Sequence, residues 1–149
     1  MSDQCLFCKF ASGAILGGTG LSNPMKSFFG IEKLKLKGRK VEGGYEVSGR
    51  WPLSSGVDNS DWNMLGFMLR EHDDGPPVDQ CFALVHRSQY EIIDTWHAVG
   101  LSGTGSKDVE IRKLFVPEFR TISARTMNGK PHAGSGVNPS PLFRLPMLA

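Results

Sequence analysis

The chain has 149 residues, 40% of them hydrophobic and 21% charged, with a formal net charge of +2. This composition fits one globular domain and excludes wholesale disorder, and the net charge is too small to favour a polyanionic partner. No uncharged apolar run approaches the ~20 residues of a membrane-spanning helix, and the N-terminus lacks the pattern of a secretion signal. We therefore expect a cytoplasmic protein with neither nucleic acid nor membrane among its partners.

Short alternating segments predict a chain of strands with almost no helix. The expected strands are residues 10–16, 28–36, 44–49, 63–69, 80–86, 90–96 and 109–116. Breakers rich in glycine, proline and serine separate them, at 17–24, 38–43, 54–60, 72–77 and 100–107. Strands at this spacing predict an all-β fold, an antiparallel β-barrel or orthogonal sandwich. The alternation stops near residue 125, so we expect a barrel over 1–124 and an irregular C-terminal arm over 125–149.

Lysines crowd the segment from residue 26 to residue 40, where they alternate with Ile31, Leu34 and Leu36. This pattern indicates a solvated or edge strand. No aromatic side chains interleave with the charges, as a site for single-stranded nucleic acid would require.

No cluster of reactive residues forms a self-sufficient catalytic centre. Cys5 and Cys8 make a Cys-x-x-Cys pair, but no second pair follows at ligand spacing. The segment 100–108, GLSGTGSKD, reverses the Gly-Lys-Ser/Thr order of a phosphate-binding loop, and the histidines are too far apart to form a short-range metal pair. We expect neither a catalytic residue nor a metal in this chain.

Two segments combine a strand with a turn that is rich in glycine and hydroxyl residues. They are residues 43–62, GGYEVSGRWPLSSGVDNSDW, and residues 95–117, TWHAVGLSGTGSKDVEIRKLFVP. Such turns present backbone N–H groups and hydroxyl oxygens together at a strand end. This surface suits a flat, polar cofactor that forms hydrogen bonds.

Both segments resemble paired motifs in the middle β-domain of the acyl-CoA dehydrogenase superfamily. The Trp-Pro-Leu-Ser-Ser-Gly stretch, together with NPSPLFRLP near the C-terminus, is most similar to the branch of reduced-flavin-dependent, two-component monooxygenases. The resemblance extends over roughly residues 16–149 and covers only the middle of that family's three domains. It implies that the chain is a fragment without either helical domain.

The resemblance implies a flavin, reduced FMN or FAD, held by Gly18, Thr19, Trp51, Ser54 and Ser55. Ser54 would meet the flavin N5/O4 edge, and Ser55 would do so if the alignment slips by one residue. Thr19 and nearby backbone N–H groups would meet the pyrimidine carbonyls, while Trp51 would offer a ring face. The residues alone leave another interpretation open, in which Trp51 plugs the barrel and the serines satisfy their own turn.

The family's second motif carries an arginine where this chain has Ser102. Ser102 and Thr104 are therefore the residues expected to contact a substrate. The implied reaction is oxygen transfer from a flavin C4a-hydroperoxide to an aromatic or similar substrate. The implied partners are a small-molecule substrate and a separate flavin reductase, and the full-length protein would be a homo-oligomer. For this chain alone we expect no activity and weak or absent flavin binding.

Two other functions remain open at the level of sequence. The chain could be the same domain of an acyl-CoA dehydrogenase, with FAD and α,β-desaturation, although that family usually has Trp-Ile-Thr where this chain has Trp-Pro-Leu. It could also be a stand-alone, non-enzymatic β-barrel binding module, with the lysine-rich strand and GTGSK as its interaction surfaces.

Overall fold

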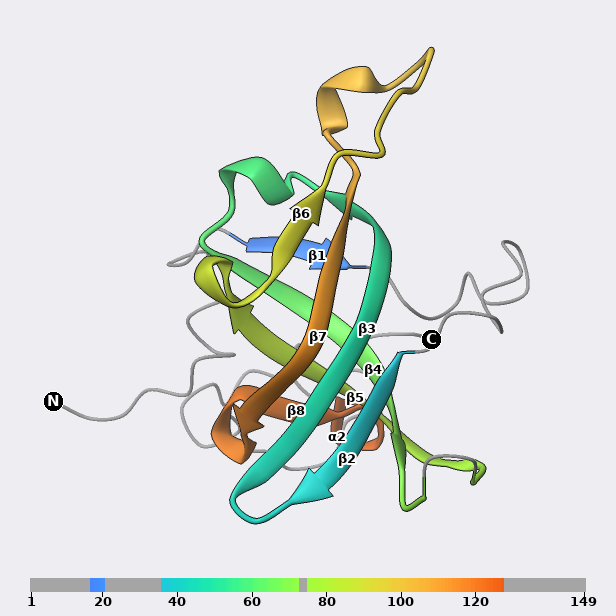
Figure 1. The fold of residues 1–149 in the computed structure, drawn as a ribbon, viewed down its shortest axis with the longest axis vertical. Coiled ribbons are helices and arrows are strands. Elements are labelled where there is room, and N and C mark those ends of the chain that lie inside the picture. The colour runs from blue at the N-terminus through green and yellow to red at the C-terminus, as the bar shows by residue number, and fades with distance from the viewer. Residues whose placement is uncertain (1–16, 21–35, 73–74, 128–149) are drawn as a thin grey trace, which may run out of the picture.

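The computed structural model describes residues 17–20, 36–72 and 75–127, which form one strongly curled sheet (Figure 1). The strands follow the order β6-β7-β3-β1-β4-β5-β8, and β2 pairs with both β3 and β4. The strands are β1 (Gly17–Gly20), β2 (Lys37–Val41), β3 (Gly44–Ser55), β4 (Trp62–Arg70), β5 (Pro77–His86), β6 (Glu91–Ile93), β7 (Lys107–Pro117) and β8 (Thr121–Ser123). The helical turns are η3 (Val57–Asn59), η4 (Arg87–Gln89), η5 (Ser102–Thr104), η6 (Glu118–Arg120) and α2 (Ala124–Met127). The expected all-β class is confirmed.

Two short strands bridge the gap between the long strands β3 and β4. β1 pairs antiparallel with the end of β3 and parallel with the start of β4. β2 pairs antiparallel with the first half of β3 and parallel with the end of β4. Figure 1 shows the two bridging strands at different heights along β3. The sheet is therefore antiparallel apart from these two parallel contacts.

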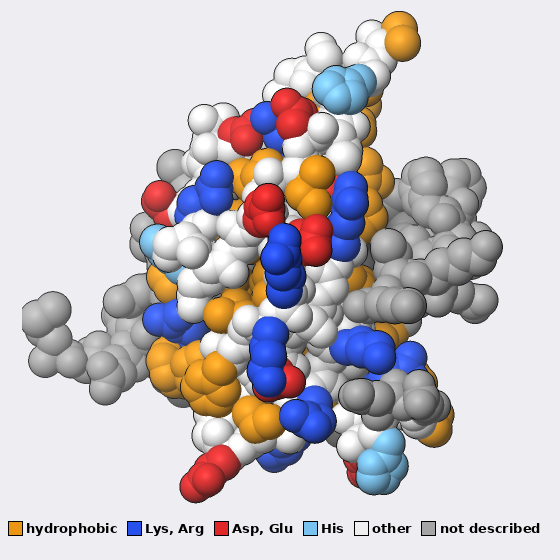
Figure 2. All heavy atoms as spheres, viewed as in Figure 1, with side chains coloured by type: hydrophobic (Ala, Val, Ile, Leu, Met, Phe, Trp, Pro, Cys, Tyr) orange, Lys and Arg blue, Asp and Glu red, His pale blue; other side chains and the backbone are white. Residues whose placement is uncertain are grey.

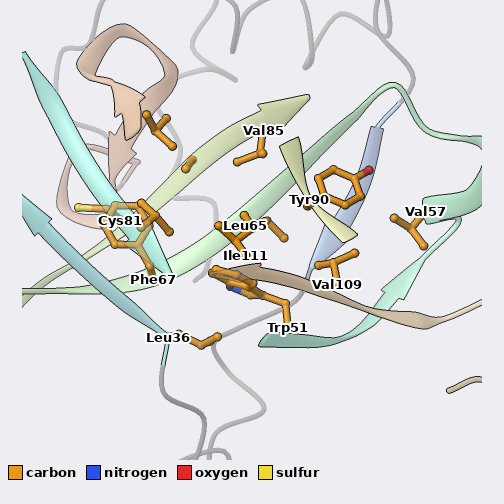
Figure 3. Packing of buried hydrophobic residues seen from close by; sticks show 13 residues of the cluster. Leu36, Trp51, Val57, Leu65, Phe67, Cys81, Val85, Tyr90, Val109 and Ile111 are labelled. Carbon is orange, nitrogen blue, oxygen red and sulfur yellow. The ribbon is translucent and has the colours of Figure 1, made fainter. Parts of the chain in front are cut away.

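Inward-facing side chains of the long strands build one hydrophobic core, seen from close by in Figure 3. Its largest fully buried side chains are Trp51 on β3 and Phe67 on β4, each 1% exposed. The Trp51 indole Nε1 donates a hydrogen bond of 2.6 Å to the carbonyl of Gly66. This bond satisfies the single polar atom that the indole carries into the core.

The outer face of β3 and β7 is charged, and Figure 2 shows basic and acidic side chains close together over it. Glu46 on β3 pairs with Arg39 of β2 at 3.6 Å and with Lys113 of β7 at 3.0 Å. Arg50 pairs with Asp108 at 2.9 Å. One face packed on the core and one in water explains the alternation seen in the sequence.

Three segments near the ends of strands differ from those expected from the sequence. Residues 38–43 were expected to break the chain, but most of them belong to β2, and the tight turn is limited to the two residues before Gly44. Gly38 lacks a side chain because the Phe67 ring fills the space where a Cβ would lie. Residues 17–20 of another expected breaker form β1, and the strand expected at 90–96 is only Glu91–Ile93.

Other expectations concern segments outside the described residues. These segments are the strands expected at 10–16 and 28–35, the Cys5–Cys8 pair, and the arm beyond residue 127. The lysine-rich segment is described only from residue 36, and β2 has partners on both sides, so this part of it is not an edge strand. Within the described ranges, no helix is long and apolar enough to cross a membrane.

The buried thiol of Cys81 should make the stability of the protein depend on pH. Its thiol is 3% exposed, and burial, followed by the charge of Asp79, raises its pKa from 9.0 to about 11. Because the fold favours the neutral thiol, this contribution to stability is fully present below pH 9 and is lost as pH rises through 11. We expect the unfolding free energy of the wild type to fall more steeply between pH 9 and 11 than that of Cys81→Ala. The measurement is a set of urea unfolding curves for both proteins at several pH values. An equal fall of the unfolding free energy with pH in both proteins would contradict the prediction.

Candidate functional site

The two glycine- and hydroxyl-rich segments meet at one end of the sheet. β3 and β7 run antiparallel, with Gly44 opposite Pro117 and Ser54 opposite Lys107. The last residues of β3 therefore lie beside the first residues of β7. In Figure 1 this end, at the top of the view, carries η3 and the long loop between β6 and β7.

A line of three hydroxyl groups connects the two segments, and we call it the hydroxyl chain: Ser55, Ser106 and Thr104. The Oγ atoms of Ser55 and Ser106 are 2.8 Å apart, and Ser106 Oγ lies 2.7 Å from Thr104 Oγ1. Thr104 Oγ1 donates to the carbonyl of Leu101 at 3.0 Å. Ser106 is 5% exposed, whereas Ser55 and Thr104 are exposed. The hydroxyl chain thus runs from one surface residue to another through a buried hydroxyl.

The two serines of the Ser-Ser-Gly motif have opposite environments. Ser54 is fully buried, and its Oγ lies 3.4 Å from Nδ2 of Asn63, which is also fully buried. Ser55 is exposed at the surface. Only Ser55 therefore presents its hydroxyl to a molecule that approaches this end of the sheet.

A β-bulge in β3 decides which serine faces inward. Trp51 lies opposite Val109 and Ser54 opposite Lys107, so β3 advances by three residues while β7 advances by two. Leu53, inside this step, has a φ of 60°. One extra residue shifts the inward phase, so Trp51 and Ser54 both point to the core. The strand expected at 44–49 is therefore longer than predicted, because β3 continues to Ser55 through the bulge.

Backbone and ionic contacts hold the two loops at this end together. The N–H of Gly56 donates to the carbonyl of Thr104 at 2.9 Å. Lys107 Nζ lies 3.1 Å from Asp58 on η3 and 3.6 Å from Asp94 after β6. The hydrogen bond that Lys107 donates to Asp58, with smaller contributions from the charges of Asp58 and Asp94, raises the pKa of Lys107. The lysine therefore stays charged and joins three segments.

β1 brings Gly18 and Thr19 to the same place. Gly18 lies opposite Asn63, and Thr19 lies between Ser55 on β3 and Met64 on β4. The structure thus gathers three of the five expected cofactor residues, Gly18, Thr19 and Ser55, at the end of the sheet where β1 meets β3 and β4. We call this end of the sheet the edge. Ser54 is next to them but faces the core.

The other expected residues are placed as follows. Trp51 lies in the core with its Nε1 bonded to Gly66, so its ring does not face the surface beside Ser55. Ser102 is exposed on η5. Thr104 shares η5 with it, but its hydroxyl is engaged by Ser106 and Leu101.

Sequence reasoning missed Asn63 and Ser106. A signal for Asn63 was available, because it shares the alternate positions of Leu65 and Phe67 along β4, and a polar residue in that phase must be buried. Ser106 precedes the regular alternation of β7, so its burial depends on tertiary contacts such as the one between its Oγ and that of Ser55 at the end of β3.

The main hollow found among the described residues, of about 580 Å³, is shallow and shares no residue with the hydroxyl chain. It is lined by η4, β6 and the middle of β7, from Arg87 to Ile92 and from Glu110 to Lys113. The candidate site is therefore a surface edge in this structure.

Comparison with known proteins finds flavin-dependent relatives of this chain. No protein-family model matches the chain. The oxygenase subunit HsaA of a flavin-dependent monooxygenase from Mycobacterium tuberculosis is 42% identical over 106 residues, which cover 71% of this chain and 26% of HsaA. The oxygenase component of an FADH2-dependent resorcinol hydroxylase from Rhizobium sp. is 40% identical over 114 residues, with 72% and 26% covered. The homologues of this chain are flavin-dependent monooxygenases. It spans 26% of the length of these two relatives.

Solved structures agree with the sequence comparison. The crystal structure of HsaA from M. tuberculosis superposes with a TM-score of 0.74 at 36% identity, covering 88% of this chain and 31% of that one. XiaF from Streptomyces sp., in complex with FADH2 and glycerol, has a TM-score of 0.64 at 29% identity, with 86% and 29% covered. A glutaryl-CoA dehydrogenase from Mycobacterium smegmatis, at 12% identity and a TM-score of 0.58, shares the fold. The monooxygenase homologues thus have the acyl-CoA dehydrogenase-like fold, and a flavin is their cofactor.

Proposed function

We propose that this chain is the flavin-contacting middle part of a two-component monooxygenase, whose full-length form adds oxygen to an aromatic or similar substrate. The observation that supports this proposal is the meeting of the two motif segments at one edge, joined by the hydroxyl chain. In this proposal a reduced flavin, FMN or FAD, lies against that edge.

The residues at the edge fit a flavin. The isoalloxazine carries N–H and C=O groups along one side, which need both acceptors and donors from the protein. Ser55 is exposed, and a serine hydroxyl can both donate and accept a hydrogen bond, while Thr19 lies opposite Ser55 on β1. Bound here, the flavin supplies the oxygen chemistry, while these residues bind and orient it.

The buried residues behind the edge have a supporting role in this proposal. The Asn63–Ser54 pair and the Trp51–Gly66 hydrogen bond join β3 to β4 on the core side of the sheet. They would hold the edge rigid, which a precise cofactor contact requires. Ser102 stays available to contact a substrate, whereas the hydroxyl of Thr104 is engaged by Ser106 and Leu101.

The partners proposed for the full-length protein are a small-molecule substrate, a separate flavin reductase and further copies of the same protein, in the cytoplasm. The relatives are about four times as long as the matched segment, so we propose that this chain alone binds flavin weakly and does not turn over substrate.

Anaerobic titration of the full chain with reduced FMN and reduced FAD tests the proposal. We expect a rise in melting temperature with flavin concentration, because a ligand that binds only the folded state stabilises it. Ser55→Ala should raise the dissociation constant by about 3- to 10-fold through loss of one hydrogen bond. Ser48→Ala, on the distant half of the same strand, is the matched control and should leave it unchanged.

Two outcomes would favour the other functions. Stabilisation by oxidised FAD but not by reduced flavin would favour an acyl-CoA dehydrogenase domain. No stabilisation by any flavin would favour a non-enzymatic binding module.

A further inference from the structure

Lys107 connects three segments around Ser55 at the end of the sheet. It lies opposite Ser54 on β3, and its Nζ is 3.1 Å from Asp58 on η3 and 3.6 Å from Asp94, which follows β6. The side chain of Lys107 is 24% exposed, whereas those of Asp58 and Asp94 are 44% and 65% exposed. The lysine is therefore the least solvated member of a three-charge cluster, and both carboxylates share it.

The turn after β3 and the end of the β6–β7 loop touch at several points. The N–H of Gly56 donates to the carbonyl of Thr104 at 2.9 Å. The carboxylate of Asp58 lies against Gly105, because a Cβ at Gly105 would be 3.5 Å from Asp58 Oδ2. Gly105 has a φ of 51°, a left-handed conformation that favours glycine. These contacts place the turn that begins at Ser55 directly beside the last residues of the loop.

The charge of Lys107 keeps this arrangement closed. Oxygens of Asp58 and Asp94 both lie within 3.6 Å of its Nζ, so without the ammonium group the two like charges would repel each other at close range. That repulsion would separate η3 from the segment after β6. Because exposed ion pairs add little to global stability, the effect of this cluster is local, on the position of η3.

We propose that Lys107 is a positioning residue for the edge: by bridging two carboxylates, it holds the turn that begins at Ser55 in the place where a flavin meets it. Ser55 is followed by Gly56 and then by η3, so a movement of η3 moves the end of β3 with it. Salt screens charges that are exposed to solvent, so flavin binding at the edge weakens as the salt concentration rises. This inference rests on the proposed function.

The first measurement is the dissociation constant of the full chain for reduced riboflavin, in anaerobic titrations at about 0.02 M and about 0.5 M NaCl. Riboflavin has the isoalloxazine of FMN and FAD but no phosphate, whose own charge would respond to salt. Lys107→Met is similar in size but uncharged, and it should raise the dissociation constant about 2- to 5-fold at low salt, the range for exposed ion pairs. The wild type should lose the same factor at high salt, whereas the variant should change little.

Two further variants separate this position from charge in general. Lys107→Arg keeps a positive charge within reach of both carboxylates, so it should restore the affinity and its salt dependence. Lys113→Met removes an ion pair of similar length, 3.0 Å to Glu46, on the charged outer face of β3 and β7. It should leave the dissociation constant at both salt concentrations as in the wild type.

Hydrogen exchange tests the positioning without any flavin. The N–H of Gly56, which donates to Thr104, should exchange about 2- to 5-fold faster in Lys107→Met than in the wild type, relative to the amides of β4 and β5. Lys113→Met should leave this rate unchanged.

The outcomes separate this inference from the proposed function. An unchanged Gly56 exchange rate, an unchanged affinity in Lys107→Met, no recovery in Lys107→Arg or an equal loss in Lys113→Met would overturn the inference and leave the proposed flavin contact. Binding of reduced FMN or FAD without binding of riboflavin would do the same. If the wild type bound none of the three flavins, both the inference and the proposed function would be wrong.

Discussion

Trp51→Ala will lower the free energy of unfolding by about 3–5 kcal/mol, the range for removing a large aromatic side chain from a packed core. The indole is 1% exposed, and it packs in one cluster with Phe67 and Leu65. Its loss also leaves the Gly66 carbonyl without the 2.6 Å hydrogen bond that it accepts from Nε1. Urea unfolding followed by circular dichroism measures the change.

Trp51→Phe is the matched variant, because it keeps a ring in the core and removes the indole N–H. We expect a smaller loss, of about 1–3 kcal/mol, mainly from the unsatisfied carbonyl and the reduced volume. A loss below about 1 kcal/mol for Trp51→Ala, far under the range of about 3–5 kcal/mol for removing a buried aromatic side chain, would show that the ring does not anchor this core. The ring would then again be a candidate for a direct flavin contact.

Gly44→Ala will destabilise the hairpin of β2 and β3 by about 3 kcal/mol, at the upper end of the cost of overpacking. A Cβ on Gly44 would overlap the carbonyl oxygen of Val116 and lie 2.9 Å from the Cα of Pro117. Both atoms belong to the backbone of β7, so no rotation of a side chain relieves the overlap. The two strands must therefore separate at this point, and the first residue pairs between β3 and β7 are lost.

Gly100→Ala is the matched control, since no atom of the described residues lies within 4 Å of a Cβ at that position. It should change the unfolding free energy by no more than about 0.5 kcal/mol. The measurement is a pair of thermal and urea unfolding curves for each variant. A tolerated Gly44→Ala would mean that β3 and β7 do not approach as closely here as the structure places them.

Regular alternation predicted the strands that lie in the middle of the sheet. β4, β5 and β7 occur where the sequence indicates them, with ends extended by a few residues. Their side chains alternate between core and water, and apolar and polar residue types alternate along the sequence in the same way. β2 was missed because its glycine and basic residues match a turn, whereas Gly38 is there to make room for the Phe67 ring.

The sequence predicted only part of the candidate site. The two segments around Ser55 and Thr104 are recognisable by their composition, but nothing local shows that their ends meet. The choice between Ser54 and Ser55 depended on a bulge that inserts one residue into β3. The burial of Ser106 depends on tertiary contacts, among them its contact with Ser55 at the end of β3.

By itself, the amino-acid sequence determined the all-β class, the positions of the regular strands and the pair of motifs shared with flavin-dependent monooxygenases. These features follow from local preferences and from side-chain patterns with a period of two. The tertiary structure alone decided which serine faces outward, that Trp51 lies in the core, and that three hydroxyls form one connected chain. Each of these depends on residues far apart in the sequence, brought together by strand pairing and by one extra residue in β3.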